Sequence, residues 1–139
     1  MSGIDACLSE ALAIPGVRGA SLVDWTTGLA LGVAGEGPNH DHEAAAAEAA
    51  ELARLTFESS AFTQADQPER AVEDGRAERA DGPVEDLIVT ARGGYHLIRF
   101  VETAFDSSVF LYLWLDRAES NLAVARFRLR DLTAALVLS

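Results

Sequence analysis

The sequence is poor in cysteine and in positive charge. Cys7 is its only cysteine, so no disulfide framework can form, and a reducing compartment such as the cytoplasm is expected. Lysine is absent, and all 11 basic residues are arginines set against 22 acidic residues. The resulting net charge of −11 argues against nucleic acid or an anionic membrane surface as the main partner.

Long apolar runs are also missing. No stretch reaches the length that spans a bilayer, and the N-terminal segment lacks the basic and apolar regions of a signal peptide. Hydrophobic residues nevertheless make up 49% of the 139 residues, which is typical of a globular chain with a real core. The length suits a single domain, residues 1–139. We expect a cytoplasmic protein.

Three extended runs joined by short links dominate the second half of the chain. They are Val84–Ala91, Tyr95–Val101 and Val109–Asp116, and each is rich in branched or aromatic residues. Links this short allow only antiparallel neighbours, so the runs predict a three-stranded meander. The last run is apolar on both faces, because Leu111 and Leu113 alternate with aromatic residues. A strand of this kind has a layer packed on each side of it.

The remaining segments complete a mixed α+β domain. We predict a short helix over Ser2–Ala13, strands over Val17–Trp25 and Gly28–Ala34, and a long helix over His42–Phe62. A last helix follows Asp116, which is predicted to cap it. Between the long helix and the meander, residues at about 63–83 are polar and charged, which predicts a flexible acidic insertion.

The long helix carries a stripe of small and apolar residues that would face the sheet. Its members are Ala45, Ala49, Leu52, Ala53 and Thr56. A flanking stripe, Ala44, Leu55 and Phe62, is more than a simple surface helix needs. It reflects either an alanine-rich composition or a second helix packed against this one.

No residue pattern indicates an enzyme acting alone. His40 and His42 are two residues apart, whereas a helical metal pair needs i and i+4 spacing. His96 is interpreted as a strand residue with a local hydrogen bond, and Cys7 has no predictable base nearby. The Gly35–Pro38 segment lacks the further residues of a phosphate loop and is interpreted as a turn. We therefore expect no catalytic residues, no metal and no cofactor.

Several segments taken in order resemble the roadblock family of dynein light-chain-like proteins. They are Ile14-Pro-Gly-Val-Arg-Gly-Ala-Ser-Leu-Val-Asp24 with Thr27-Gly28, Leu87-Ile-Val-Thr90, Gly94-Tyr-His-Leu97, Leu115-Asp-Arg117, Asn121-Leu-Ala123 and Ala125-Arg126. The similarity covers nearly the whole chain and departs at Asp66–Gly82, where the family has a shorter link. It implies a five-stranded antiparallel sheet of order 2-1-5-4-3, with the two terminal helices on one face and the long helix on the other.

The resemblance also implies partners. Family members pair their third strands as homodimers or heterodimers, which here would place Leu87, Ile88 and Val89 at a homodimer interface. Bacterial relatives regulate small Ras-like GTPases, and some act beside sensor kinases.

A size argument independently predicts an incomplete monomer. Five strands at about 4.8 Å spacing form a sheet roughly 24 Å wide, while one helix covers about 10 Å. The long helix alone cannot cover its face of the sheet, so another chain should meet the rest.

Two function classes follow. The first is a non-catalytic dimeric regulator or scaffold, at most a GTPase-activating partner, that binds a small Ras-like GTPase through Glu48, Glu51 and Leu55. The alternative is a small-molecule-sensing or signalling adaptor domain with a pocket beneath a helix. An arginine finger from Arg99 or Arg126 is a further hypothesis, since such a group stabilises transferring phosphate charge.

Overall fold

The computed structural model describes residues 3–63, 84–101 and 108–138. The predicted acidic insertion therefore lies almost wholly outside the described residues. The elements follow in the order α1 (Gly3–Leu12), β1 (Val17–Asp24), β2 (Leu29–Gly35), η1 (Pro38–His40), α2 (His42–Glu58), α3 (Ser60–Thr63), β3 (Asp86–Ala91), β4 (Gly94–Val101), β5 (Val109–Asp116) and α6 (Leu122–Leu138).

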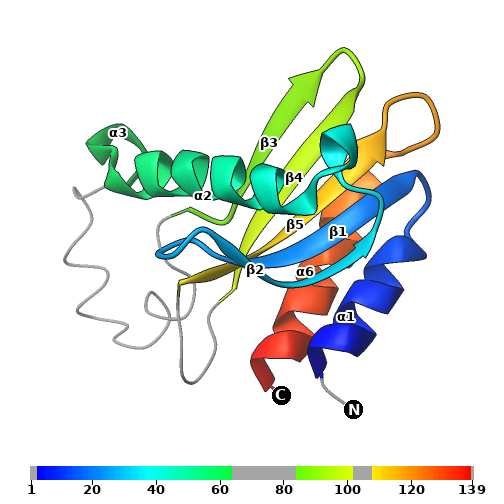
Figure 1. Ribbon diagram of the computed structural model, residues 1–139, viewed down its shortest axis with the longest axis horizontal. Coiled ribbons are helices and arrows are strands. Elements are labelled where there is room, and N and C mark those ends of the chain that lie inside the picture. The colour runs from blue at the N-terminus through cyan, green and yellow to red at the C-terminus, as the bar shows by residue number, and fades with distance from the viewer. Residues whose placement is uncertain (1–2, 64–83, 102–107, 139) are drawn as a thin grey trace.

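The five strands form one antiparallel sheet in the order β2-β1-β5-β4-β3. Helices α1 and α6 lie side by side on one face, and α2 crosses the other face (Figure 1). The predicted fold class, strand order and division of the helices between the two faces are confirmed. β5 lies at the centre, while β2 and β3 form the two edges.

β5 contributes to a separate core on each side of the sheet. Leu111 and Leu113 pack under α1 and α6, together with Leu8 and Leu129. On the other side, the core contains the buried α2 alanines and Phe110. The apolar character of both faces of this strand therefore has the physical cause that the sequence predicted.

The first hairpin joins β1 to β2 through a tight turn at Asp24–Gly28. Asp24 accepts hydrogen bonds on Oδ1 from the backbone N–H and the hydroxyl of Thr26, and Gly28 takes a φ of 80°. In β2, a Cβ added at Gly32 would lie 3.0 Å from side-chain carbons of Ile4 and Leu8. The small residues of this strand thus serve both an edge position and a close contact with α1.

The long helix is shorter than predicted. It ends at Glu58 rather than Phe62, because Ser59 is extended (φ −81°, ψ 120°) and a separate turn, α3, follows it. The Ser59 hydroxyl donates to the Leu55 carbonyl at 2.8 Å, and its N–H donates to the Thr56 carbonyl. A serine can offer the backbone such alternatives to the helical pattern.

The buried stripe of α2 is also rotated from the predicted one. Its buried residues are Ala46, Ala49, Ala50, Ala53 and Thr56. Ala45 and Leu52, which were predicted to face the core, are only partly buried. In a helix segment made almost entirely of alanine, all sides of the helix are similarly hydrophobic. The hydrophobic periodicity therefore cannot predict which side faces the sheet. Close approach to the sheet sets it instead.

The cap of α6 was assigned to the wrong residue. Asn121 caps the helix through Oδ1, which accepts from the backbone N–H of Val124 at 3.1 Å. Asp116 instead accepts from the N–H of Glu119 at 2.8 Å, within the turn before the helix. Both residue types suit N-caps, so only the path of the chain between them decides. One stripe of α6 packs against the sheet: Leu122 is partly buried, and Ala125, Leu129, Leu132 and Leu136 are buried.

Candidate functional site

Helix α2 covers only part of its face of the sheet. It lies against β1 and β2, and the upper parts of β3 and β4 project beyond it in Figure 1. Alanines at 46, 50 and 53 are fully buried and let the helix approach the sheet closely. No bulky side chain on that stripe extends the cover toward β3, so a cleft remains between the helix and the far strands.

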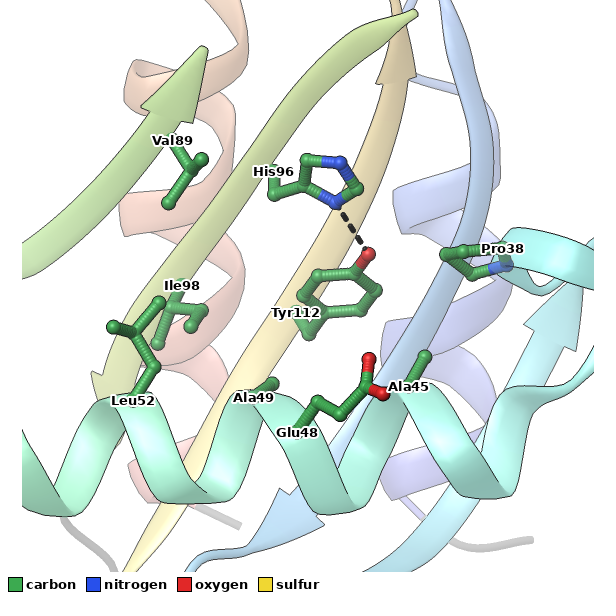
Figure 2. Close-up of a pocket in the computed structure, with 9 residues that line it drawn as sticks. All are labelled: Pro38, Ala45, Glu48, Ala49, Leu52, Val89, His96, Ile98 and Tyr112. Atoms are coloured by element: carbon green, nitrogen blue, oxygen red, sulfur yellow. Dashed lines mark hydrogen bonds between the residues drawn. The ribbon is translucent and has the colours of Figure 1, made fainter. Parts of the chain in front are cut away.

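The cleft has a volume of about 190 Å³ and is mostly apolar (Figure 2). It is lined by Pro38, Ala45, Glu48, Ala49, Leu52, Val89, His96, Ile98 and Tyr112. Helix α2 supplies one wall, and the neighbouring strands β3, β4 and β5 supply the floor and the opposite wall. Leu52, Ile98 and Val89 make one end apolar, while the polar groups gather at the other.

A histidine–tyrosine pair forms the polar end. His96 Nδ1 lies 2.7 Å from the Tyr112 hydroxyl, which joins β4 to β5. In the register of these strands, His96 is opposite Trp114, and Ile98 is opposite Tyr112. His96 and Tyr112 are therefore diagonal neighbours on the same face of the sheet. The predicted local hydrogen bond of His96 is thereby confirmed. Sequence reasoning missed Tyr112, although the alternation and register of the two strands would have placed it beside His96.

Burial determines the charge state of this pair. Desolvation lowers the pKa of His96, which favours a neutral ring. Burial, with a smaller contribution from the Glu48 carboxylate, raises the pKa of Tyr112 and keeps the phenol protonated. Figure 2 shows the Glu48 side chain reaching from α2 toward Tyr112. Glu48 is the acidic side chain in the cleft lining.

The three residues predicted at a dimer interface lie on the edge strand β3, as expected. Leu87 packs in the core beneath α2, and Val89, 38% exposed, borders the cleft. Ile88 points to the opposite face and packs against the core beneath α1 and α6. The three side chains therefore do not form one patch, and what they share is the open backbone edge.

The three residues predicted to bind a partner all lie exposed on α2. Leu55 is 63% exposed, and Glu51 pairs with Arg54 at 3.6 Å. Glu48 belongs to the cleft wall. At 100° per residue, the three share the side of the helix that also carries the cleft residue Leu52, so the surface they form is continuous with the cleft.

Comparison with solved structures identifies this arrangement. A Roadblock/LC7 domain from Streptomyces avermitilis matches with a TM-score of 0.65 and 19% identity, over 95% of this chain and 92% of that one. MglB of Myxococcus xanthus matches with a TM-score of 0.64 and 17% identity, over 97% and 82%. The fold is that of Roadblock/LC7 domains.

A third structure, the gliding protein MglB of Thermus thermophilus, matches the same fold with a TM-score of 0.66 and 17% identity, over 97% of this chain and 86% of that one. By sequence alone, no protein-family model and no curated protein matches the chain. The Roadblock/LC7 likeness is therefore carried by the arrangement of the elements.

Within this Roadblock/LC7 fold, the two arginines considered as arginine fingers converge on one carboxylate. Arg126 Nε lies 2.9 Å from Asp86 Oδ2, and Arg99 Nη1 lies 3.5 Å from the same oxygen. Glu85 is 4.0 Å from Arg99. Both guanidinium groups are thus engaged in holding the start of β3 to β4 and α6, which is a structural role.

The other candidate catalytic groups lie apart. Cys7 is buried in α1, where burial raises the pKa of its thiol to about 11. His42 Nε2 contacts the Gly35 carbonyl at 3.0 Å, on the opposite side of α2 from the predicted partner residues. No group of three or more His, Cys, Asp or Glu side chains within the described ranges could hold a metal ion. Among the described helices, none combines the length and apolar character needed to cross a membrane.

Proposed function

We propose that this chain is a non-catalytic dimeric regulator or scaffold that binds a small Ras-like GTPase. The fold is consistent with such a role, because the solved structures that it matches include MglB proteins. The roadblock resemblance seen in the sequence implies the same activity. In this proposal, the residues that hydrolyse GTP belong to the GTPase.

One observation carries the proposal: Leu55 is exposed on α2, whereas the opposite side of this helix packs against the chain's own sheet. Leu55 is 63% exposed and lies beside the acidic residues Glu48 and Glu51. Leu55 adjoins Leu52 and the apolar cleft, and a contiguous apolar surface rimmed by charged residues is the arrangement expected of a protein-binding site. The chain's own core does not use Leu55.

Pairing through β3 would place two such surfaces in one assembly. β3 presents an open edge that contains neither proline nor lysine, and unpaired backbone groups on such an edge are available to another strand. A homodimer related by a two-fold axis at β3 would extend the sheet and bring the two α2 faces together. A sensor kinase is a further partner of the same assembly that the resemblance implies.

The test is binding of small Ras-like GTPases in their GDP and GTP states, with turnover measured in parallel. Leu55→Arg, or Glu48→Arg with Glu51→Arg, should change the free energy of unfolding by no more than about 0.5 kcal/mol, because the sites are exposed. Leu55→Arg should weaken GTPase binding by more than about 1 kcal/mol if this residue is an anchor.

Leu29→Arg is the matched control, because Leu29 is 64% exposed on the opposite edge strand β2. It should leave binding unchanged. Dimer mass is measured alongside, since Leu55 could instead meet its own twin across the dimer. A folded dimer carrying the α2 changes that still binds its GTPase normally would move the contact away from α2.

A further inference from the structure

A separate apolar surface lies at β2, the edge of the sheet opposite β3. Its aliphatic residues Leu29, Leu31 and Val33 are 64%, 49% and 47% exposed. Single exposed apolar residues are ordinary on a protein surface, whereas a group of them on one edge strand marks a contact surface. Pairing through β3 would extend the sheet at its other edge, so this surface stays open in the proposed dimer.

A groove of about 500 Å³ lies beside these residues, between β2 and the start of α2. Leu29 and Val33 form its strand side. Val33 is on the α2 face of the sheet, because it is opposite Ser21 in the register, and Ser21 is opposite Tyr112 of the core beneath α2. The other side of the groove is formed by residues 40–43. One wall is therefore aliphatic and the other polar.

The polar wall carries negative charge. Asp41 and Glu43 line it, and no arginine is among the described residues of the lining. Asp41 Oδ1 accepts from the backbone N–H of Ala44 at 3.0 Å, which fixes this carboxylate at the start of the helix. Glu43 is exposed, and no hydrogen bond or ion pair joins its carboxylate to another described residue. The Glu43 carboxylate is thus open to a cationic partner.

We propose that this groove binds an extended segment of another protein that contains both basic and aliphatic residues. Aliphatic side chains of the segment pack against Leu29 and Val33, and a lysine or arginine pairs with Glu43. From Leu29 to Val33 a strand rises about 13 Å, which matches roughly four extended residues and exceeds the length of a single small ligand. The register irregularity within β2 interrupts regular strand pairing, so side chains rather than a continuous backbone ladder recognise the segment.

Charge selects this occupant over others. The net charge of −11 attracts a basic segment and repels nucleic acid, an anionic membrane surface and a second copy of the chain. The chain's own insertion at about residues 63–83 contains more acidic than basic residues, so Glu43 repels it as well. This inference does not depend on the GTPase proposal.

The experiment compares three peptides of equal length. Leucine alternates with lysine in the first, serine replaces leucine in the second, and glutamate replaces lysine in the third. Each is titrated into the full-length protein while backbone amide NMR shifts are followed. The leucine–lysine peptide should give saturable shifts at Leu29–Val33 and at residues 40–43. The serine–lysine peptide should bind about threefold more weakly or worse, because it buries little apolar surface, and the leucine–glutamate peptide should not saturate.

Two matched pairs of substitutions locate the binding. Leu29→Ser should weaken leucine–lysine binding about fivefold or more. Leu55→Ser, at a leucine of nearly equal exposure on α2, should leave it unchanged. Glu43→Gln should weaken it about threefold, because an exposed ion pair contributes modestly. Glu58→Gln removes an equal charge at the other end of α2 and should have no effect. All four side chains are exposed, so each variant should remain folded.

Three results would overturn the inference. The first is an absence of saturable binding by the leucine–lysine peptide. The second is equal binding of the serine–lysine peptide, which would mean that net charge alone attracts both. The third is a loss on Leu55→Ser in place of Leu29→Ser, which would move the peptide to the predicted partner surface of α2. Since GTPase binding is measured separately with the α2 variants, failure here leaves that proposal unaffected.

Discussion

Asp86 is the residue on which two cationic side chains converge. Its side chain is only 11% exposed, and that of its cross-strand partner Arg99 is 17% exposed. Arg126, nearly half exposed, closes the group from α6. A charge this far from water depends on its partner, because removing one member of a mostly buried pair leaves the other without compensation.

We therefore predict that Asp86→Asn lowers the free energy of unfolding by about 1–3 kcal/mol, the cost of leaving a buried hydrogen-bonding group unsatisfied. Urea denaturation measures the loss. Glu85→Gln is the control: the Glu85 side chain is 68% exposed and only 4.0 Å from Arg99, so a change within about 0.5 kcal/mol is expected. Equal losses in the two variants would show that Asp86 has no special part.

His96 makes stability depend on pH. Burial lowers its pKa in the folded protein below the ordinary value of 6.5, so the unfolded chain binds the proton more readily. Neutral His96 therefore makes its full contribution to the free energy of unfolding above about pH 6.5. That contribution declines as the pH falls from there through the lower pKa of the folded protein.

We expect the unfolding midpoint in urea to fall more steeply between about pH 7 and about pH 5 for the wild type than for His96→Gln. Glutamine keeps a polar group near Tyr112 but does not titrate. A histidine NMR titration gives the folded pKa directly. Identical pH profiles for the two proteins would contradict this linkage.

Among the elements, the two edge strands differ in how they are protected. β2 carries a register irregularity opposite Leu22 and Val23 and lies against α1 through Gly32. β3 pairs with β4 in unbroken register from Asp86 to Ala91. Irregularities blunt an edge against pairing, whereas a regular edge invites it. The regular edge is thus the better candidate for dimerisation.

Ile88→Pro should make the protein monomeric or prone to aggregation, because proline removes a donor and distorts the edge. Light scattering at micromolar concentration measures the mass. Val89→Arg is a gentler second variant at an exposed edge position and should give a folded monomer. Leu31→Arg, at a comparably exposed position on β2, should remain dimeric. A monomeric wild type would refute the dimer proposal.

At the scale of the whole molecule, we expect the domain to fold without the predicted acidic insertion at residues of about 63–83. Phe62 and Val84, on its two sides, line a common cavity of about 500 Å³, so the ends to be joined are near each other. Loop-closure cost changes slowly with length.

Deleting Gln67 to Arg79 should therefore preserve one cooperative thermal transition. Circular dichroism during heating tests this expectation, with the full chain as reference. Loss of the cooperative transition in the deletion variant would show that the segment contributes to the packing of the domain.

The local sequence pattern was sufficient to predict most of the fold. The strands of the meander were predicted within two residues at each end, because β-branched runs bounded by Gly and Asp leave few alternatives. The two apolar faces of Val109–Asp116 placed that strand at the centre. The turn at Asp24–Gly28 has residues suited to it, because Asp24 accepts a hydrogen bond from the Thr26 N–H and Gly28 takes a positive φ.

Tertiary structure decided what local pattern left ambiguous. The rotation of α2, the break at Ser59 and the choice of Asn121 over Asp116 as cap depend on where neighbouring elements come to rest. The cleft depends on them most, since His96 and Tyr112 meet only when β4 and β5 pair in one register, and Glu48 joins them only when α2 stops short of β3. Contacts between segments that are distant in the chain depend on tertiary packing, and the spacing of residues in the sequence does not predict them.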